Sequence, residues 1–267
     1  MSDFRYVSIK ATGPVAYVTI KRAERANALS FDVLQELEAA ALSMRDEPEV
    51  RVVVLSGDGK HFSSGADLGD PSPGSGPGSR TPLVQRRRHA RMGGRLIRAW
   101  LDLDQISIAA WNGAAMGGGG CLATACDFRI AADDAFLCYP EIDIGINLQW
   151  WGLPLITRLA GPSRAKRLVI GGERIGAPLL ERWGVVDEVV PRAEMLSRAS
   201  ELATFYASKP PIAAQMIKRC VNALSGALDE AVMHMDFDQN LLTAATDDAA
   251  LARRTYRTQE TPHYTSN

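Results

Sequence analysis

Two short stretches of small residues each follow an apolar run and could present backbone N–H groups to a single ligand atom. The first, "HFSSGADL", spans residues 61–68, and the second, "NGAAMGGGGCLATACD", spans residues 112–127 and holds four consecutive glycines. The turn after a strand is a common ligand site in α/β sheets, and N–H groups that begin a helix near Gly118 would carry its partial positive charge. Two such turns that converge would form an oxyanion hole, which stabilises a developing negative oxygen.

The glycine run has other interpretations. Gly118, Gly120 and Ala123 satisfy the G-x-G-x-x-A dinucleotide fingerprint, but the helix that follows lasts only a turn or two before Asp127 and lies outside the first strand–helix–strand unit. The phosphate-binding G-x-x-x-x-G-K-[ST] motif does not occur. Close packing of a helix on a strand explains one or two glycines, whereas a run of four favours an additional role.

Short β-branched runs alternate with a helical pattern around these turns. Strands are predicted over residues 15–20, 51–57, 106–113 and 127–132. Between the first two, residues 30–46 carry apolar side chains at helical spacing, with Ser30 as the N-cap. From Trp150 onward helices dominate, interrupted by a short apolar run at 184–190. Strands that alternate with helices predict an α/β architecture with parallel pairing.

The composition is that of an ordinary globular protein. The chain has 267 residues, of which 46% are hydrophobic and 23% charged, and this length is ample for a core. A formal net charge of −1 gives no reason to expect nucleic acid. The basic stretch "RRRHARMGGR" at 86–95 is interpreted as a solvated helix face, with an anionic ligand or RNA as the alternative.

The cysteines and the hydropathy of the chain indicate the cellular compartment of the protein. Cys121, Cys126, Cys138 and Cys220 lie in apolar stretches without C-x-x-C spacing, which favours reduced, mostly buried thiols and no metal site. No run approaches the length of a membrane span, and the first ten residues lack the apolar centre of a signal peptide. We therefore expect a cytoplasmic protein without a membrane partner.

One segment differs in composition from the rest of the chain. The stretch "GDPSPGSGPGSRTP", residues 69–82, is rich in proline, glycine and serine, which predicts a loop. Because it follows the first small-residue turn directly, it could close over a ligand. A plain surface insertion is the alternative.

Five motifs, in this order, resemble those of the enoyl-CoA hydratase/isomerase family, the crotonase superfamily, over nearly the whole chain. "KRAERANALS" (21–30) is similar to the CoA-binding segment of the family, and "HFSSGADL" to its first oxyanion segment. Residues 112–146 resemble the second oxyanion segment with the acid that follows it. Residues 161–190 and "KPPIAAQMIK" (209–218) resemble the later helices.

The resemblance implies a fold and an assembly. The fold is an α/β spiral, a superhelix of repeated β-β-α turns, which we expect over residues 1–195. A helical C-terminal region used in trimerisation is expected over residues 196–267. Family members form trimers that often pair into hexamers, so a homotrimer or hexamer is expected. The implied substrate is an acyl-CoA thioester, with no other cofactor.

The resemblance also assigns site residues. The backbone N–H groups of Ala66 and Gly118 would hold the thioester carbonyl and stabilise the enolate formed when an α-proton is lost. Glu24 departs from the pattern, because hydratases often carry a lysine there near the CoA phosphates. The residues expected to contact CoA or the acyl group are Arg22, Glu24, Arg25, Ala26, Ala28, Asp67, Leu68, Gly117, Cys121 and Gln149.

The family's two acid positions favour one chemistry. Hydratases carry two catalytic glutamates. The resemblance implies that Glu141 stands at one of these two positions and that Cys121 stands at the other. Adding water to a double bond needs both a base and an acid, whereas moving a double bond from C3 to C2 needs one base that takes a proton from C2 and returns it at C4. The sequence therefore favours isomerisation of 3-enoyl-CoA over hydration of 2-enoyl-CoA, with the pKa of Glu141 raised by apolar neighbours.

Other activities remain open at this point. A hydratase could use a substitute acid such as Asp143 or an ordered water, and a thioesterase could use Glu141 to activate water against the carbonyl. A non-catalytic acyl-CoA- or RNA-binding homologue is the third alternative. Asp143 is otherwise interpreted as a solvent-facing or ion-paired residue.

The acyl pocket is expected to have an unusual shape. Cys121 has no neighbouring histidine to activate it, so it is interpreted as a filler of this pocket and not as a nucleophile. Gln149 stands where dehalogenases and dienoyl isomerases of the superfamily carry an aspartate, and an amide cannot replace that carboxylate as nucleophile or base. Leu148, Trp150 and Trp151 replace residues that are small in hydratases.

Overall fold

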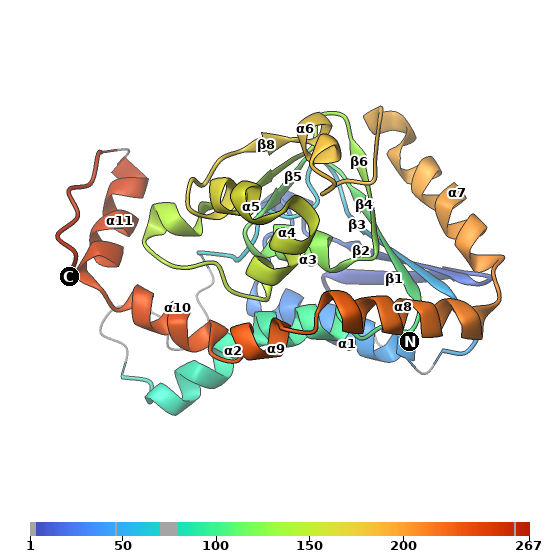
Figure 1. The fold of residues 1–267 in the computed structure, drawn as a ribbon, viewed down its shortest axis with the longest axis horizontal. Helices are drawn as coiled ribbons and strands as arrows, with labels where there is room; N and C mark the ends of the chain where they lie inside the picture. The colour runs from blue at the N-terminus through green and yellow to red at the C-terminus, as the bar shows by residue number, and fades with distance from the viewer. Residues whose placement is uncertain (1–3, 46, 70–79, 259) are drawn as a thin grey trace.

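A six-stranded sheet forms one wall of the molecule (Figure 1). The computed structural model describes residues 4–45, 47–69, 80–258 and 260–267. The strands follow the order β1-β2-β3-β4-β6-β9, with β1 antiparallel to β2 and all later neighbours parallel. Their bounds are Val7–Thr12, Val15–Ile20, Val52–Gly57, Ile106–Trp111, Phe128–Ala132 and Glu188–Val190 in that order. The predicted α/β architecture and its four strands are confirmed.

A second, smaller sheet holds the strands that lead into the site. It consists of β5 (Ala114–Met116), β7 (Phe136–Cys138) and β8 (Ile175–Gly176), in the order β5-β7-β8. The predicted strand at 106–113 ends at Trp111, because the chain turns at Gly113 (φ 59°) and passes from the large sheet into the small one. The next strand pair, β6 and β7, repeats this step. The repetition produces the expected β-β-α spiral.

Helices pack around the two sheets. The predicted helix at 30–46 is confirmed as α1, and the Val33 N–H donates to Ser30 Oγ at 3.4 Å, as expected of an N-cap. Every residue of α3, which carries the glycine run, is buried. The helices before the C-terminal region are α1 (Phe31–Arg45), α2 (Leu83–Leu101), α3 (Gly118–Ala125), α4 (Gly152–Ala160), α5 (Pro162–Val169) and α6 (Ala177–Arg182), with short 3-10 helices η1 (Ala23–Arg25), η2 (Pro140–Ile144) and η3 (Arg192–Glu194).

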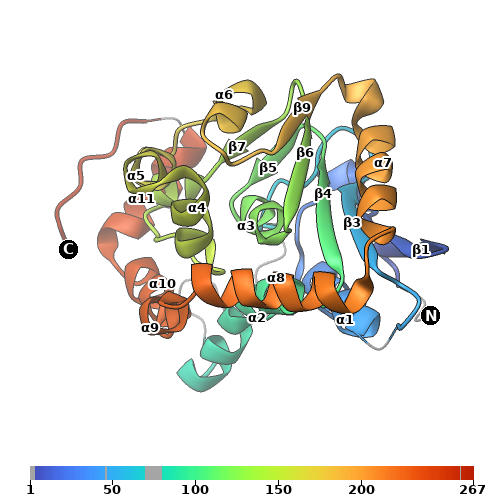
Figure 2. The ribbon, with the colours of Figure 1, turned by 45° about the vertical axis from the view of Figure 1, so that its right-hand side comes forward.

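The C-terminal helices fold back onto the spiral. They are α7 (Met195–Ala207), α8 (Pro211–Ser225), α9 (Asp229–Met233), α10 (Asp236–Ala244) and α11 (Asp247–Thr258). Figure 2 shows α7 along the face of the large sheet, where Tyr17 donates to Ser200 Oγ at 3.1 Å and the rings of Phe128 and Tyr206 stack. Helix α10 packs on α2, and α11 packs on η2. The boundary at residue 195 stays a prediction.

The basic stretch at 86–95 lies on α2 and makes contacts within the chain. Arg87 pairs with Asp238 on α10 at 2.6 Å, and Arg95 pairs with Glu38 on α1 at 2.8 Å. The Arg91 guanidinium lies over the Phe237 ring at 4.3 Å. These partners link α2 to α1 and α10, so three of the basic side chains take part in helix–helix contacts.

Three further expectations concern the loop at 69–82, the cysteines and membrane spans. The loop predicted at 69–82 lies mostly outside the described residues, which exclude 70–79. Three of the four free cysteines are buried, and Cys220 on α8 is exposed. No helix in the described ranges is long and apolar enough to cross a membrane.

Candidate active site

Three chain segments that are distant in sequence lie side by side at the edge of the small sheet. The Ser63 N–H donates to Ala114 O, and the Met116 N–H donates to Ser63 O, each at 3.0 Å. Strand β5 pairs in parallel with β7, and just beyond it the Gly117 N–H donates to Cys138 O at 2.9 Å. These bonds place both predicted oxyanion turns beside the 3-10 helix η2, which follows β7.

A cavity of about 120 Å³ opens where the three segments meet. Ala66 comes from the first turn, Gly118 from the second and Glu141 from η2, and all three line this cavity. Three other residues implied by the resemblance also line it, namely Leu68, Gly117 and Gln149. The structure therefore brings together six of the predicted site residues.

The two predicted oxyanion donors are free to bind a ligand. Within the described part of the chain, neither the Ala66 N–H nor the Gly118 N–H forms a hydrogen bond. Gly65 has φ 86°, and a Cβ there would lie 2.5 Å from Met116 O, so only glycine allows the two turns to approach this closely. Gly118 is the first residue of α3, where an N–H group has no partner within the helix and carries its positive dipole.

Two glycines of the run are required by packing. A Cβ at Gly119 would lie 2.7 Å from Ser63 O, and a Cβ at Gly120 would lie 2.6 Å from Leu137 Cδ1. Gly119 thus lets α3 approach the first oxyanion turn, and Gly120 lets it approach strand β7.

The other two glycines face the site. A Cβ at Gly117 (φ 48°) would lie 2.5 Å from Glu141 Oε1, and a Cβ at Gly118 would overlap the indole of Trp150. A side chain at any of the four positions would collide with a neighbour, but packing of α3 on the first turn and on β7 accounts for only two of the glycines, as expected. Two of these neighbours, Glu141 and Trp150, line the cavity.

Glu141, the predicted base, lines the cavity with a buried carboxyl oxygen. It follows Pro140 in η2, and its Oε2 is buried without a hydrogen-bond partner among the described residues. Burial, followed by the nearby charge of Asp143, raises the pKa of Glu141 to about 7. A carboxyl group with this pKa accepts and returns a proton readily near neutral pH.

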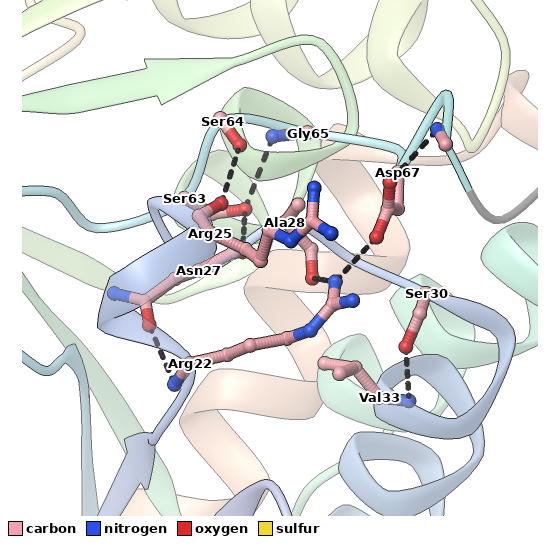
Figure 3. A network of polar contacts seen from close by, with 11 residues as sticks. Arg22, Arg25, Asn27, Ala28, Ser30, Val33, Ser63, Ser64, Gly65 and Asp67 are labelled. Atoms are coloured by element: carbon pink, nitrogen blue, oxygen red, sulfur yellow. Dashed lines mark hydrogen bonds and ion pairs between the residues drawn. The ribbon is translucent and has the colours of Figure 1, made fainter.

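The segment that resembles the family's CoA entry is tied to the first oxyanion turn (Figure 3). Arg22 Nη1 donates to Ala28 O at 2.9 Å and to Asp67 Oδ2 at 2.6 Å. Ala26 takes a left-handed conformation (φ 51°), and its carbonyl accepts from the Ser64 N–H at 2.9 Å. Hydrogen bonds therefore join residues 22–28 and 64–67 into one rim beside Ala66.

Asn27 organises this rim, although the sequence did not single it out. The side chain is fully buried, and its Oδ1 accepts from the Arg22 N–H at 3.0 Å. Its Nδ2 donates to Asp58 O at 2.9 Å and to His61 O at 2.6 Å. The neighbouring residues Glu24 and Arg25 are exposed.

Cys121 lies behind the cavity and does not line it. The side chain is fully buried, and its thiol donates to Gln149 O at 3.5 Å. Burial, followed by the charges of Glu141 and Asp236, raises the pKa of Cys121 well above its usual value. A protonated thiol with no contact to the cavity does not fit a nucleophile.

Two polar residues of α10 lie at or next to the site, and sequence reasoning missed both. Asn240 lines the cavity, and its Nδ2 donates to Asn147 O at 3.1 Å. Asp236 is buried, and its Oδ2 accepts from the Trp151 N–H at 3.3 Å. Their positions on a C-terminal helix carry no local signal, because only the tertiary fold brings α10 to the cavity.

Comparisons with known proteins agree with this geometry. The sequence model described as enoyl-CoA hydratase/isomerase matches residues 10–267. A short-chain-enoyl-CoA hydratase of Clostridium acetobutylicum is 33% identical over 221 residues, covering 82% of each chain.

Solved structures are similar over most of the chain. An enoyl-CoA hydratase from Mycobacterium avium subsp. paratuberculosis has a TM-score of 0.85 and 25% identity, covering 98% of this chain and 99% of that one. A monofunctional enoyl CoA isomerase from M. smegmatis has a TM-score of 0.69 and 33% identity, covering 83% of this chain and 94% of that one. The fold, the paired turns and these matches together show that the chain belongs to the enoyl-CoA hydratase/isomerase family, the crotonase superfamily.

Proposed function

We propose that this enzyme isomerises 3-enoyl-CoA to 2-enoyl-CoA, with Glu141 as the single acid–base group. One observation carries the proposal: among the residues that the structure describes, Glu141 is the only carboxylate that lines the site cavity. Cys121, at the family's other acid position, is fully buried and has no carboxylate to activate a water.

The proposed reaction needs only groups at the cavity. The thioester carbonyl accepts hydrogen bonds from the Ala66 and Gly118 N–H groups, which stabilise negative charge on its oxygen. Glu141 removes a proton from C2, and the electrons form a dienolate. The same carboxyl group then returns the proton at C4, which leaves the double bond between C2 and C3.

Hydration of 2-enoyl-CoA is the second candidate, because the relative from C. acetobutylicum is named a hydratase. Hydration would need a second acid–base group. The Asp143 carboxylate does not supply it, because it packs against Gly172: a Cβ added to Gly172 would lie 3.0 Å from Asp143 Oδ2. Asp236 lines a different cavity. Neither carboxylate is among the residues that line the site cavity.

Product analysis separates these reactions. The purified enzyme would be offered 3-enoyl-, 2-enoyl- and saturated acyl-CoA, and products would be identified by chromatography and mass spectrometry. We expect conversion of 3-enoyl- to 2-enoyl-CoA to be faster than formation of 3-hydroxyacyl-CoA. Faster hydration would refute the single-acid mechanism, and release of free CoA from saturated thioesters would indicate a thioesterase.

The pKa of Glu141 predicts the pH dependence of isomerisation. The base must be ionised, so kcat/KM should rise with the carboxylate fraction as pH increases and level off above a midpoint near 7. Initial rates between pH 5 and 9 would check this. A rate that falls as pH rises through 7 would instead require a protonated carboxyl group.

We also propose that the chain is cytoplasmic and assembles as a homotrimer or hexamer through its C-terminal helices. Helix α8 exposes Ile217, Val221 and Leu224 on one face at i, i+4 and i+7 spacing, and Leu224 is 81% exposed. Apolar patches of this kind mark interaction surfaces in soluble proteins.

The assembly can be tested by size-exclusion chromatography with light scattering. Leu224→Glu should produce smaller species, because it places a charge in the apolar face of α8. Leu42→Glu, at an exposed apolar position on α1 outside the C-terminal helices, is the matched control and should not change the mass. An unmodified protein that is monomeric at micromolar concentration would contradict the proposal.

A further inference from the structure

Trp150 separates two cavities. Among the described residues, it is the only one that lines both the site cavity of about 120 Å³ and a neighbouring cavity of about 240 Å³. The second cavity lies between α2 and the helices α9 and α10, and its lining includes Trp151, Met233 and Phe237. Its lining is thus partly aromatic and apolar, although exposed arginines of α2 and the carboxylates of Glu230 and Asp236 also contribute.

The indole of Trp150 is fixed between two glycines. A Cβ at Gly93 on α2 would overlap the pyrrole side of the ring, and a Cβ at Gly118 on α3 would overlap its benzene side. Trp150 is only 7% exposed. Both neighbouring helices therefore lack a side chain at the point where they contact the ring, which leaves the ring little room to move.

The backbone at this position is also restrained. Trp150 and Trp151 both have φ 59°, a left-handed conformation that is uncommon for bulky residues. The buried carboxylate of Asp236 accepts from the Trp151 N–H, and the Gly152 N–H donates to Gln149 O at 3.2 Å. Consecutive strained residues at the wall of a cavity are typical of a functional constraint.

The site cavity is small, and this limits the length of the acyl group that it can hold. Pockets that enclose a drug-sized ligand occupy roughly 300–1,000 Å³, and the site cavity is well below that range. A short acyl group has room beside Gly118 and Glu141. A longer chain that continued past Gly118 would meet the Trp150 ring.

We propose that Trp150 closes the acyl pocket and restricts this enzyme to short-chain acyl-CoA substrates. The inference rests on the proposed function, because it requires the acyl group to lie in the cavity beside Glu141. Removing the indole joins the two cavities, so that a medium-length acyl chain extends between α2 and α10. Trp150 is then the residue that determines chain-length specificity.

The test compares Trp150→Ala with the unmodified enzyme on 3-enoyl-CoA substrates of four, six, eight and ten carbons. Each methylene that enters an apolar pocket is worth about a fourfold gain in affinity. We expect kcat/KM of the unmodified enzyme to fall beyond the short substrates. In Trp150→Ala, the ratio of ten-carbon to four-carbon kcat/KM should rise at least about tenfold.

Trp151→Ala is the matched control. It removes an equally large ring from the adjacent left-handed residue, but Trp151 lines only the second cavity, so the preference for short chains should persist. Trp150→Leu provides a smaller change if the alanine variant does not fold, and it should shift the chain-length profile in the same direction.

Binding of saturated acyl-CoA by calorimetry separates this inference from the proposed reaction. If no enoyl-CoA is isomerised but Trp150→Ala still gains affinity for decanoyl-CoA over butanoyl-CoA, the reaction is wrong and the role of Trp150 stands. An unmodified enzyme that prefers ten carbons would overturn the inference. So would a folded Trp150→Ala with an unchanged profile, or a protein that binds no acyl-CoA.

Discussion

Glu141→Gln is expected to lower the rate of isomerisation by about 10²–10⁴-fold, the range typical of losing a general base. An amide has nearly the shape of the carboxylate but cannot accept the C2 proton. Because the oxyanion donors and the cavity remain, binding of acyl-CoA should persist while kcat falls. Steady-state kinetics with a 3-enoyl-CoA, together with a binding assay for a saturated analogue, would measure both.

The free energy of unfolding of Glu141→Gln shows whether the loss of activity comes from the missing base or from a less stable fold. The pKa of Glu141 is raised from 4.5 to about 7 in the folded state. Between these values the folded protein binds more protons than the unfolded chain, so stability falls as pH rises through this window. Glu141→Gln removes this penalty and should raise the free energy of unfolding at pH 8 by roughly 3 kcal/mol.

Asp143→Asn is the matched control for Glu141. Asp143 lies on the same 3-10 helix and its charge raises the pKa of Glu141, but the cavity is not lined by its side chain. This variant should shift the midpoint of the pH–rate profile downward and leave the plateau rate unchanged. If Glu141→Gln stays fully active while Asp143→Asn is inactive, the base has been assigned to the wrong residue.

Ala66→Pro should reduce kcat by roughly 10²–10³-fold, the cost of removing one oxyanion donor. Proline has no N–H group, and the Ala66 N–H makes no hydrogen bond within the described structure, so its loss removes a ligand contact and no structural bond. Rates with 3-enoyl-CoA and thermal unfolding of both proteins would be measured together.

The control for this variant keeps the donor. Ala66→Gly retains the N–H group at the same position and should keep most of the activity. The partner donor at Gly118 cannot be tested in the same way, because any side chain there would overlap the indole of Trp150. A folded Ala66→Pro enzyme with full activity would remove Ala66 from the mechanism.

Part of this site could be read from the sequence because its signals are local. The small residues around Ala66, the glycines from Gly117 and the acid in "YPEIDIGI" each depend on a short segment whose backbone conformation dictates residue type. Alternating strands and helices likewise predicted the sheet that supports them. The order of these segments was enough to indicate the family.

Other features depend on long-range contacts. The raised pKa of Glu141 requires the burial that the assembled fold supplies, and the reason for four glycines lies in neighbours such as Ser63 and Leu137. Asn240 reaches the cavity from a helix that follows Glu141 by almost a hundred residues. No pattern within a short window of sequence carries this information.

The amino-acid sequence alone therefore determined the class of fold and the two backbone turns, since strand patterns and glycine requirements act over a few residues. The resemblance to the family also indicated that Cys121 stands where hydratases carry one of their two glutamates. Only the tertiary structure decided that Cys121 lies behind the cavity and that Trp150 divides the cavity from its neighbour. Side-chain burial and cavity shape arise from packing between distant elements, and packing is a property of the folded chain as a whole.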